Sequence, residues 1–338
     1  MAETPSQADY ARAYDTLDFL RGAVEAAAFQ RARKGQAELS VVLVTGFLGA
    51  GKTSLMRRLV SQDHGLRLAA IVNDLANLNM DAALVAEAGA DSGLETLALA
   101  NGCVCCSQSG GVARTLAEIQ GWAEPPDCVL LEASGVADPS ALAIVVGGMD
   151  GVRLDAVVAV VDAAAQDETE ELIARGVRAA DMVLINKTDL VAPAAAADLE
   201  RELAALAPKA AILRTVDCAV PPGLILDPPP RNEDAPDAPP ALEDDRFATF
   251  ELVQTAAVSR REIEALIATA PAGLYRAKGV LRLRDAKAPE LLQAVGRRWR
   301  WSPAGPEASR LAGHLVVIMA SDASDTAAHF SPIFAETP

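Results

Sequence analysis

Three of the chain's five cysteines lie within four positions, in the segment NGCVCCS, as Cys103, Cys105 and Cys106. Alternate side chains of an extended segment point to the same side, so Cys103 and Cys105 can bind one ion with Cys106 beside them. Two or three thiolates suit Zn²⁺, Cu(I) and other soft or borderline cations. No histidine is close in sequence, so a further ligand comes from another segment, from water, or is absent. An open ligand position is typical of a site that passes its ion on.

Two other uses of these thiols stay open at this point. They could form a redox-sensing disulfide, or they could hold a purely structural metal ion. The other two cysteines, Cys128 and Cys218, stand at the start of one apolar run and just after another. We expect both to be ordinary core cysteines, because unpaired cysteine packs as a small apolar side chain.

A phosphate-binding loop is the second chemical feature. The segment VVLVTGFLGAGKTSL, residues 41–55, places G-x-x-x-x-G-K-T between an apolar run and a helical segment. The glycines let backbone N–H groups surround a phosphate, and the helix N-terminus adds a favourable dipole. Lys52 would reach the β- and γ-phosphates, and the Thr53 hydroxyl would bind Mg²⁺. The predicted phosphate-binding set is Gly46, Gly49, Ala50, Gly51, Lys52, Thr53 and Ser54.

Two further strand ends complete a nucleotide site. The run CVLLEASG ends in Glu132, which suits a second Mg²⁺ contact, direct or through water, while the N–H of Gly135 could meet a γ-phosphate. The run MVLINKTDL ends in Asn-Lys-x-Asp, and the Asp189 carboxylate can accept from both N1–H and N2–H₂ of guanine. Adenine would leave that carboxylate unpaired. We therefore predict GTP or GDP as the nucleotide, with Asn186 fixing the loop and the stem of Lys187 covering the base.

The elements that must position these residues follow from alternating apolar and helical segments. Apolar runs at 40–45, 68–73, 128–132, 155–162, 181–186 and 210–215 are predicted to be strands buried between helix layers. Their alternation with helices predicts an α/β fold, a P-loop NTPase domain with a mostly parallel sheet. A small α+β domain follows, with strands at 246–254, 279–285 and 313–320 and helices at 259–270 and 288–299.

The predicted organisation has four parts. An N-terminal helical extension covers 1–38, the P-loop GTPase domain 39–218, a linker rich in proline and acidic residues 219–245, and the C-terminal α+β domain 246–332.

The order of these motifs resembles the CobW-type GTPases, a family of metal chaperones related to the nickel chaperones UreG and HypB. The resemblance covers roughly residues 40–330 and includes RAKG within LYRAKGVLRL. It implies a Mg²⁺-dependent GTPase that binds a transition metal, zinc first and cobalt second, through Cys-x-Cys-Cys and delivers it to a client metalloprotein. Alternatives are a GTP-binding metal sensor without significant turnover and a thiol redox regulator.

The resemblance also implies a switch segment in IVNDLANLNMD. Asp74 and Asp81 match acidic positions of the family, and either could orient the attacking water; with Lys52 and Glu132 they form the predicted catalytic set. Leu75-Ala76-Asn77 replaces the family's Phe-Gly-Glu, which removes a carboxylate and a flexible glycine from a segment expected to sense the γ-phosphate.

Charge and composition limit the classes of partner that the chain is expected to bind. With 338 residues and a net charge of −16, the chain is expected to form two domains and to avoid nucleic acid and anionic membranes. We see no signal peptide and no long apolar run, so we expect a cytoplasmic protein with reduced thiols. GRRWRW, residues 296–301, is interpreted as a helix end and a strand, or as a partner surface. The expected partners are GTP or GDP, a metal ion, a client protein and a second copy of the chain.

Overall fold

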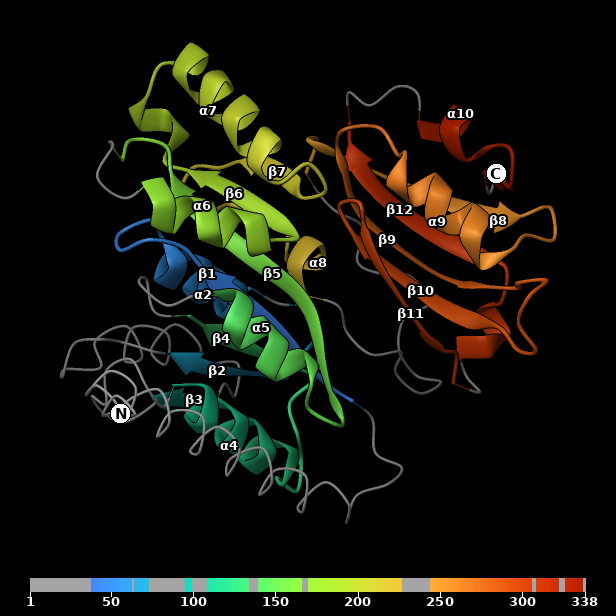
Figure 1. Cartoon of the computed structure of the whole chain (residues 1–338), viewed down its shortest axis with the longest axis horizontal. Coiled ribbons are helices and arrows are strands. Elements are labelled where there is room, and N and C mark those ends of the chain that lie inside the picture. Colours follow the sequence, from blue (N-terminus) through green and yellow to red (C-terminus); the bar gives the residue numbers. More distant parts are fainter. Residues whose placement is uncertain are drawn as a thin grey trace, which may run out of the picture. The chain divides into compact units, whose positions relative to one another are not determined.

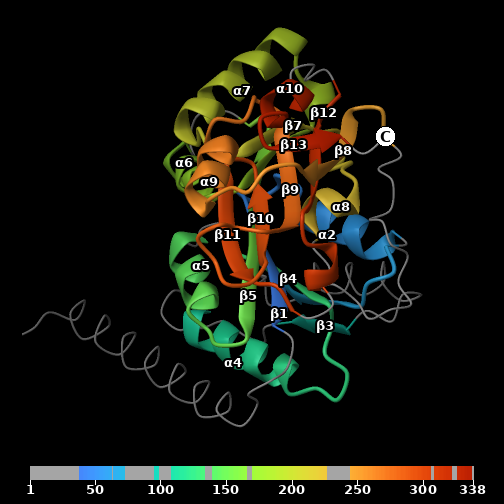
Figure 2. The same ribbon diagram turned by 90° about the vertical axis from the view of Figure 1, so that its right-hand side faces the viewer.

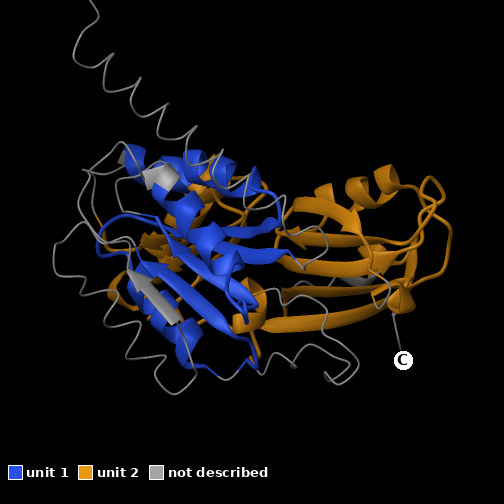
Figure 3. Cartoon of the chain, turned by 90° about the horizontal axis from the view of Figure 1, so that it is seen from below, with its two compact units in different colours: residues 1–157, 169–176, 227–229 blue, residues 158–168, 177–226, 230–338 orange. Residues whose placement is uncertain are grey.

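The computed structural model divides the chain into two compact units (Figure 3). Unit 1 comprises 1–157, 169–176 and 227–229, unit 2 comprises 158–168, 177–226 and 230–338, and the division passes through the strand β5. The described residues are 38–62, 64–72, 95–98, 108–133, 139–165, 170–226, 244–305, 308–321 and 326–336. The predicted N-terminal helical extension, 1–38, therefore lies outside the described residues, apart from Glu38.

The first sheet has seven strands in the order β3-β2-β4-β1-β5-β6-β7 (Figure 1). The strands are β1 (Leu39–Thr45), β2 (Leu68–Val72), β3 (Glu95–Ala98), β4 (Cys128–Glu132), β5 (Val152–Asp162), β6 (Met182–Asn186) and β7 (Ala211–Arg214). The pairs β1–β4, β2–β3, β2–β4, β5–β6 and β6–β7 are parallel. Every residue of β1, β2, β4 and β6 is buried, as parallel strands between helix layers require. The α/β prediction is confirmed, although β3 was not predicted.

Helices alternate with these strands. They are α2 (Lys52–Ser61), α4 (Gln108–Gln120), α5 (Pro139–Gly147), α6 (Glu170–Ala179), α7 (Pro193–Leu206) and the short α8 (Pro222–Ile225), with a 3₁₀ turn at Thr188–Leu190. In α2 the apolar residues Leu55, Met56, Leu59 and Val60 recur at helical spacing and are all buried. Within unit 1, α5 contacts both β1 and α4, and within unit 2, α7 contacts β7.

The second sheet is antiparallel and has six strands in the order β11-β10-β9-β12-β8-β13. Its elements are β8 (Phe247–Gln254), α9 (Arg260–Ala268), β9 (Leu274–Leu281), β10 (Glu290–Val295), β11 (Arg298–Pro303), a 3₁₀ turn (Ala308–Leu311), β12 (His314–Ala320), α10 (Thr326–Phe330) and β13 (Phe334–Glu336). Ile263 and Ile267 of α9 and Phe330 of α10 share one buried core with this sheet. A separate α+β domain is therefore confirmed, and Figure 2 shows β9, β10 and β11 side by side.

The predicted helix at 288–299 is wrong, because this segment forms the hairpin of β10 and β11. Leu292 and Ala294 face the core under α9, whereas Leu291 on the opposite face joins a second apolar cluster. A strand that is buried on both faces has no clear alternation, so its apolar spacing resembled that of a helix. Gly296 makes the turn with φ of 56°, a conformation that favours glycine.

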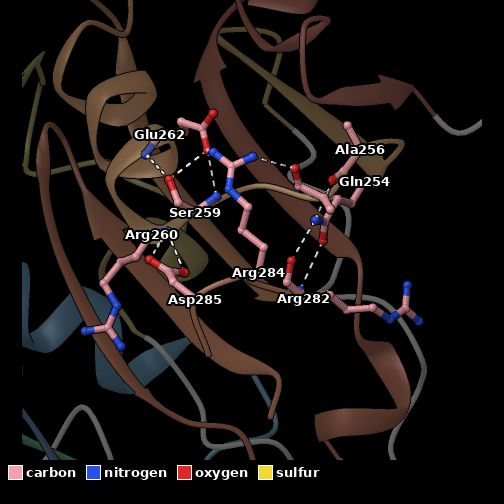
Figure 4. Close-up of polar contacts among 9 residues, drawn as sticks. Gln254, Ala256, Ser259, Arg260, Glu262, Arg282, Arg284 and Asp285 are labelled. Atoms are coloured by element: carbon pink, nitrogen blue, oxygen red, sulfur yellow. Dashed lines mark hydrogen bonds and ion pairs between the residues drawn. The ribbon is translucent and has the colours of Figure 1, made fainter. Parts of the chain in front are cut away.

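The start of α9 is fixed by a capping box, shown in Figure 4. The Ser259 hydroxyl accepts from the Glu262 N–H at 3.4 Å, and the Glu262 carboxylate accepts from the Ser259 N–H at 2.7 Å. Arg284 also donates to Glu262 at 2.5 Å, and the Arg260 N–H donates to the Asp285 carboxylate at 3.2 Å. The hydrogen bonds from Ser259, followed by Arg284, lower the pKa of Glu262 to about 2.

Residues 219–226, the first part of the predicted linker, pack within unit 2. Val220, Leu224, Ile225 and Leu226 are buried. The remainder of that segment, 227–243, lies outside the described residues. Across the described ranges, every helix is too short or too polar to cross a membrane.

Three arginines of the C-terminal domain donate to backbone carbonyls of the preceding segment of unit 2. Arg246 donates to Ala219 O at 2.9 Å, and Arg276, from the RAKG segment, donates to Leu224 O and Leu226 O, each at 3.2 Å. A third contact set joins Arg298 to Arg178 O at 3.0 Å, Ala179 O at 2.9 Å and the Asp181 carboxylate at 3.1 Å.

Candidate functional site

A glycine-rich loop joins β1 to α2 and forms the phosphate half of the candidate site. Gly49 and Gly51 have φ of 77° and 115°, so the backbone follows a path that residues with a Cβ rarely adopt. Gly51 is also the N-cap of α2, and no side chain caps that helix end. The N-terminus of α2, with its backbone N–H groups, can therefore bind and stabilise an anion.

Lys52, the first residue of α2, lies against the carboxylate that ends β4. Its ammonium is 3.6 Å from Glu132 Oε1, and the two side chains are only 7% and 5% exposed. The Lys52 ammonium also donates to the Phe47 carbonyl at 3.4 Å, which bends the lysine back over the loop. β1 and β4 pair with Val44 opposite Glu132, and this register brings the loop and the carboxylate together.

The remaining residues of the predicted phosphate-binding set lie in the same loop or directly after it. Ala50 is buried, while Gly46, Thr53 and Ser54 are half-buried within or directly after the loop. Thr53 supplies a hydroxyl and Glu132 a carboxylate beside the phosphate loop, and hard oxygen ligands of this kind are those that Mg²⁺ prefers. The donor set therefore fits a magnesium ion.

The Asn-Lys-x-Asp loop follows β6, and a second loop after β7 supports it. Asn186 is buried, and its Oδ1 accepts from the Cys218 N–H at 2.8 Å and from the Thr215 hydroxyl at 3.3 Å. The N–H and hydroxyl of Thr188 both donate to Thr215 O, at 3.2 Å and 3.1 Å. Asp189 is exposed, so its carboxylate is accessible to a ligand from solvent. The loop after β7 was not predicted as part of the site.

Asp162 is a second residue that motif spacing did not identify. It ends β5, directly opposite Asn186 in the neighbouring β6. Its carboxylate pairs with the Lys187 ammonium at 2.6 Å and accepts from the Ala164 N–H at 2.8 Å. A strand that ends in a carboxylate, as β4 does at Glu132, was the signal that could have found it.

Several predicted site residues lie outside the described residues. They are Asp74, Asp81, Cys103, Cys105, Cys106 and Gly135. In sequence each follows the carboxyl end of β2, β3 or β4. These strands are parallel to one another and β4 is parallel to β1, so their carboxyl ends share the sheet edge that carries the phosphate loop. Within the described ranges, no three His, Cys, Asp or Glu side chains gather as a metal site.

Two further cysteines and two histidines pack or form hydrogen bonds within the fold. Cys128 and Cys218 are buried, as predicted. His64 accepts from the Leu66 N–H at 3.1 Å, and its other ring nitrogen is 2.9 Å from Leu59 O. His329 is held in a similar way, 2.9 Å from Leu266 O.

Two protein-family models match this chain. Residues 40–214 match the model "CobW/HypB/UreG, nucleotide-binding domain", and residues 247–331 match "Cobalamin synthesis protein cobW C-terminal domain". The chain belongs to the CobW family. The first match spans all seven strands of the first sheet and contains the phosphate loop and the Asn-Lys-x-Asp loop, and the second spans β8 to β12 of the second sheet. The resemblance seen in the sequence is thereby confirmed.

Curated relatives of this CobW-family chain carry related names. "Zinc chaperone CobW" of a Sinorhizobium species is 31% identical over 47% of this chain and 54% of the relative. "Zinc chaperone YjiA" of Escherichia coli is 33% identical over 46% and 51%. "Zinc-regulated GTPase metalloprotein activator 1" of Dictyostelium discoideum is 28% identical over 56% and 48%. The chain thus spans about half the length of the curated relatives it matches.

Solved structures of similar proteins include Zn(II)-bound YjiA GTPase from E. coli. That comparison has 22% identity and a TM-score of 0.43, and covers 88% of this chain and 99% of the other. HypB from Helicobacter pylori in complex with nickel is 18% identical with a TM-score of 0.44, covering 61% of this chain and 88% of the other.

The arginines and tryptophans of GRRWRW are used within this CobW-family chain. Residues 298–301 begin the edge strand β11, and Gly296 and Arg297 make the hairpin turn before it, so no helix ends here. The Trp301 indole donates to the Glu264 carboxylate at 3.1 Å, and the Arg260 guanidinium lies 5.5 Å from the ring centre of Trp301. Arg298 donates to the carbonyls at the end of α6. These contacts give the segment a structural role in holding β11 to α9 and to the neighbouring part of unit 2.

Proposed function

We propose that the chain is a Mg²⁺-dependent GTPase that binds a transition metal ion through Cys103, Cys105 and Cys106 and delivers it to a client metalloprotein. Zinc is the first candidate for the cargo and cobalt the second. The observation that carries the proposal is the buried Lys52–Glu132 pair, 3.6 Å apart, beside a glycine loop at the carboxyl edge of a parallel sheet. Membership of the CobW family and the names of its curated relatives support it.

On the phosphate side, Lys52 is a fixed cation held over the loop, where it would stabilise charge that develops on the β- and γ-phosphate oxygens. The Thr53 hydroxyl and the Glu132 carboxylate would hold Mg²⁺. When bound there, the ion neutralises negative charge on the phosphate oxygens. Asp74 or Asp81 would orient the attacking water, and the N–H of Gly135 would contact the γ-phosphate.

On the base side, Asp189 would accept from N1–H and N2–H₂ of guanine. Asn186 is anchored through its Oδ1 to the loop after β7, so the turn that presents Asp189 is held before any ligand arrives. Such preorganisation favours binding, because less conformational freedom is lost when the ligand binds.

The metal side rests on where the cysteines stand in the chain. They lie between Ala98, the end of β3, and Gln108, the start of α4, so their segment begins at the edge that carries the phosphate loop. Bound GTP would hold segments 73–81 and 132–139 through its γ-phosphate, and hydrolysis would release them. The thiolates would bind the ion in the first state and lose it in the second. A second copy of the chain or the client would accelerate turnover, and the cytoplasm is the reducing compartment that keeps the thiols free.

Reciprocal coupling gives the test. If GTP raises the affinity for Zn²⁺, then Zn²⁺ must raise the affinity for GTP by the same factor. We expect competition titrations of Zn²⁺ and of Co²⁺ to give tighter binding with a non-hydrolysable GTP analogue than without nucleotide. The variant with all three cysteines changed to serine should lose this binding while it still binds GTP. Equal metal affinities in both nucleotide states would contradict delivery driven by GTP.

Two further measurements separate the alternatives. Single-turnover hydrolysis of GTP distinguishes the GTPase from a sensor that binds GTP without turning it over. The replacement of Phe-Gly-Glu by Leu75-Ala76-Asn77 is the feature that would favour such a sensor. A disulfide among the three cysteines, found by mass spectrometry of protein that binds no metal, would instead identify a thiol redox regulator.

A further inference from the structure

Asp162 at the end of β5 is held by contacts that do not depend on any ligand. One carboxylate oxygen accepts from the Ala164 N–H at 2.8 Å, in the tight turn that follows the strand. The other oxygen pairs with the Lys187 ammonium at 2.6 Å. The Asp162 side chain is 18% exposed and that of Lys187 34% exposed, so the pair is only partly screened by water. Its carboxylate is therefore a fixed anchor for the lysine.

The backbone of Lys187 is held in an uncommon conformation. Its φ of 61° lies in the left-handed region, which residues with a Cβ adopt only where neighbouring contacts impose it. Here those contacts come from both sides. The Asn186 carbonyl accepts from the Ala163 N–H at 2.8 Å, and the Thr188 N–H donates to Thr215 O at 3.2 Å. These hydrogen bonds fix the backbone conformation of the loop. The ion pair then directs the Lys187 side chain towards Asp162.

We propose that Asp162 is a positioning residue for guanine-nucleotide binding, which holds the stem of Lys187 in the orientation that covers the base. The inference rests on the proposed function, because it assumes that the Asn-Lys-x-Asp loop binds guanine. Asp162 itself would not contact the nucleotide. It acts through Lys187, whose long side chain would otherwise sample many rotamers before binding.

Positioning of this kind has a specific signature. Its loss should weaken the binding of any ligand that carries the base and leave the binding of a bare polyphosphate unchanged. Loss of the ion pair should therefore affect GTP and GDP equally, because both carry the same base. It should leave the single-turnover rate of bound GTP unchanged, because the anchor acts on the base and not on the phosphates.

The experiment compares two isosteric variants in the full-length chain. Asp162→Asn removes the charge that holds Lys187. Asp181→Asn is the matched control, because Asp181 forms an ion pair with Arg298 in the same unit, with side chains 18% and 37% exposed. Calorimetric titration with GDP, a non-hydrolysable GTP analogue and inorganic triphosphate then measures each affinity. We expect Asp162→Asn to bind both nucleotides about tenfold more weakly, the scale of one charge-assisted hydrogen bond, with triphosphate affinity unchanged. Asp181→Asn should match the wild type for all three ligands.

A double-mutant cycle shows whether the effect passes through Lys187. Lys187→Met keeps the length of the stem and removes its charge, so Asp162→Asn should weaken GDP binding no further in that background. Unchanged nucleotide affinity in Asp162→Asn, equal weakening for triphosphate, or full additivity with Lys187→Met would each overturn the inference. If the wild-type chain binds no guanine nucleotide, the proposed function fails first, and the two failures are thereby distinguished.

Discussion

Lys52 and Glu132 are two charged side chains that the fold buries side by side at the phosphate loop. A buried ion pair is weak evidence for stability, since the cost of removing both charges from water offsets much of their attraction. An apolar pair would fill these positions, at the start of α2 and the end of β4, at little cost. We therefore interpret the pair as functional, with a lysine and a carboxylate kept in reach of a phosphate.

Asp189 gives a prediction at the same scale. Its carboxylate can accept two hydrogen bonds from guanine, whereas an asparagine amide can donate to the carbonyl oxygen that xanthine carries at that position. We expect Asp189→Asn to bind GTP about ten- to a hundredfold more weakly, as expected for lost hydrogen bonds to a charged group. The same variant should bind XTP more tightly than the wild type does, measured by titration with each nucleotide.

Asp198→Asn is the control for Asp189→Asn, because it removes the same charge from an exposed position on α7. It should leave both affinities unchanged. If Asp189→Asn kept the GTP affinity of the wild type, the base would have to be recognised elsewhere.

Residue types at strand ends and in the loops that follow them made much of the candidate site predictable. Lys52, Glu132, Asn186 and Asp189 each belong to a motif in which spacing and chemistry coincide. The support for Asn186 from Thr215 and Cys218 could not be predicted, because it comes from a loop about thirty residues away that only the pairing of β6 with β7 brings close. Asp162 is of the same kind, since it reaches Lys187 through the pairing of β5 with β6.

At the scale of elements, predictions succeeded where burial and chain pattern agreed. The parallel strands were found because they are apolar on both faces and bounded by turns. The same property led to the error at 288–299, where an antiparallel strand buried on both faces was taken for a helix. β3 was missed because ETLA is too short to show a period.

The capping box of α9 gives a pH prediction. The pKa of Glu262 in the folded chain is about 2, below its ordinary value of 4.5, so its ionised form stabilises the fold. That contribution is complete above the ordinary pKa and is lost as the pH falls from about 4.5 towards about 2. We expect Glu262→Gln to lower the thermal midpoint of the C-terminal domain near neutral pH, with the difference from the wild type vanishing across this acidic range.

Tryptophan fluorescence can follow that domain, because Trp299 and Trp301 pack against its core and Trp122→Phe removes the third tryptophan from the signal. Glu251→Gln, at an exposed position on β8, serves as the control and should show no such pH dependence. A difference for Glu262→Gln that stayed constant down to about pH 2 would mean that Ser259 and Arg284 do not favour the ionised form.

At the scale of the whole molecule, the second sheet is attached to the part of the chain that carries the Asn-Lys-x-Asp loop. Arg246 donates to Ala219 O, one residue beyond Cys218, whose N–H holds Asn186. Arg298 closes the end of α6, which leads directly into β6. The C-terminal domain is thus tied within unit 2 to the backbone that presents Asp189.

The turn of the β10–β11 hairpin adds a close backbone contact to this attachment. The Arg297 N–H donates to Lys209 O at 2.7 Å, and a Cβ on Gly296 would lie 2.5 Å from Lys209 O and 2.7 Å from Ala211 N. Gly296 also has φ of 56°, which a side chain opposes. We expect Gly296→Ala to destabilise the chain by about 3 kcal/mol, from overpacking and backbone strain together. Chemical denaturation followed by Trp299 fluorescence measures this loss.

In Gly305→Ala, where the added Cβ meets nothing within 4 Å, stability should stay at the wild-type level. Equal stabilities for the two variants would mean that the hairpin turn does not bear on the segment before β7.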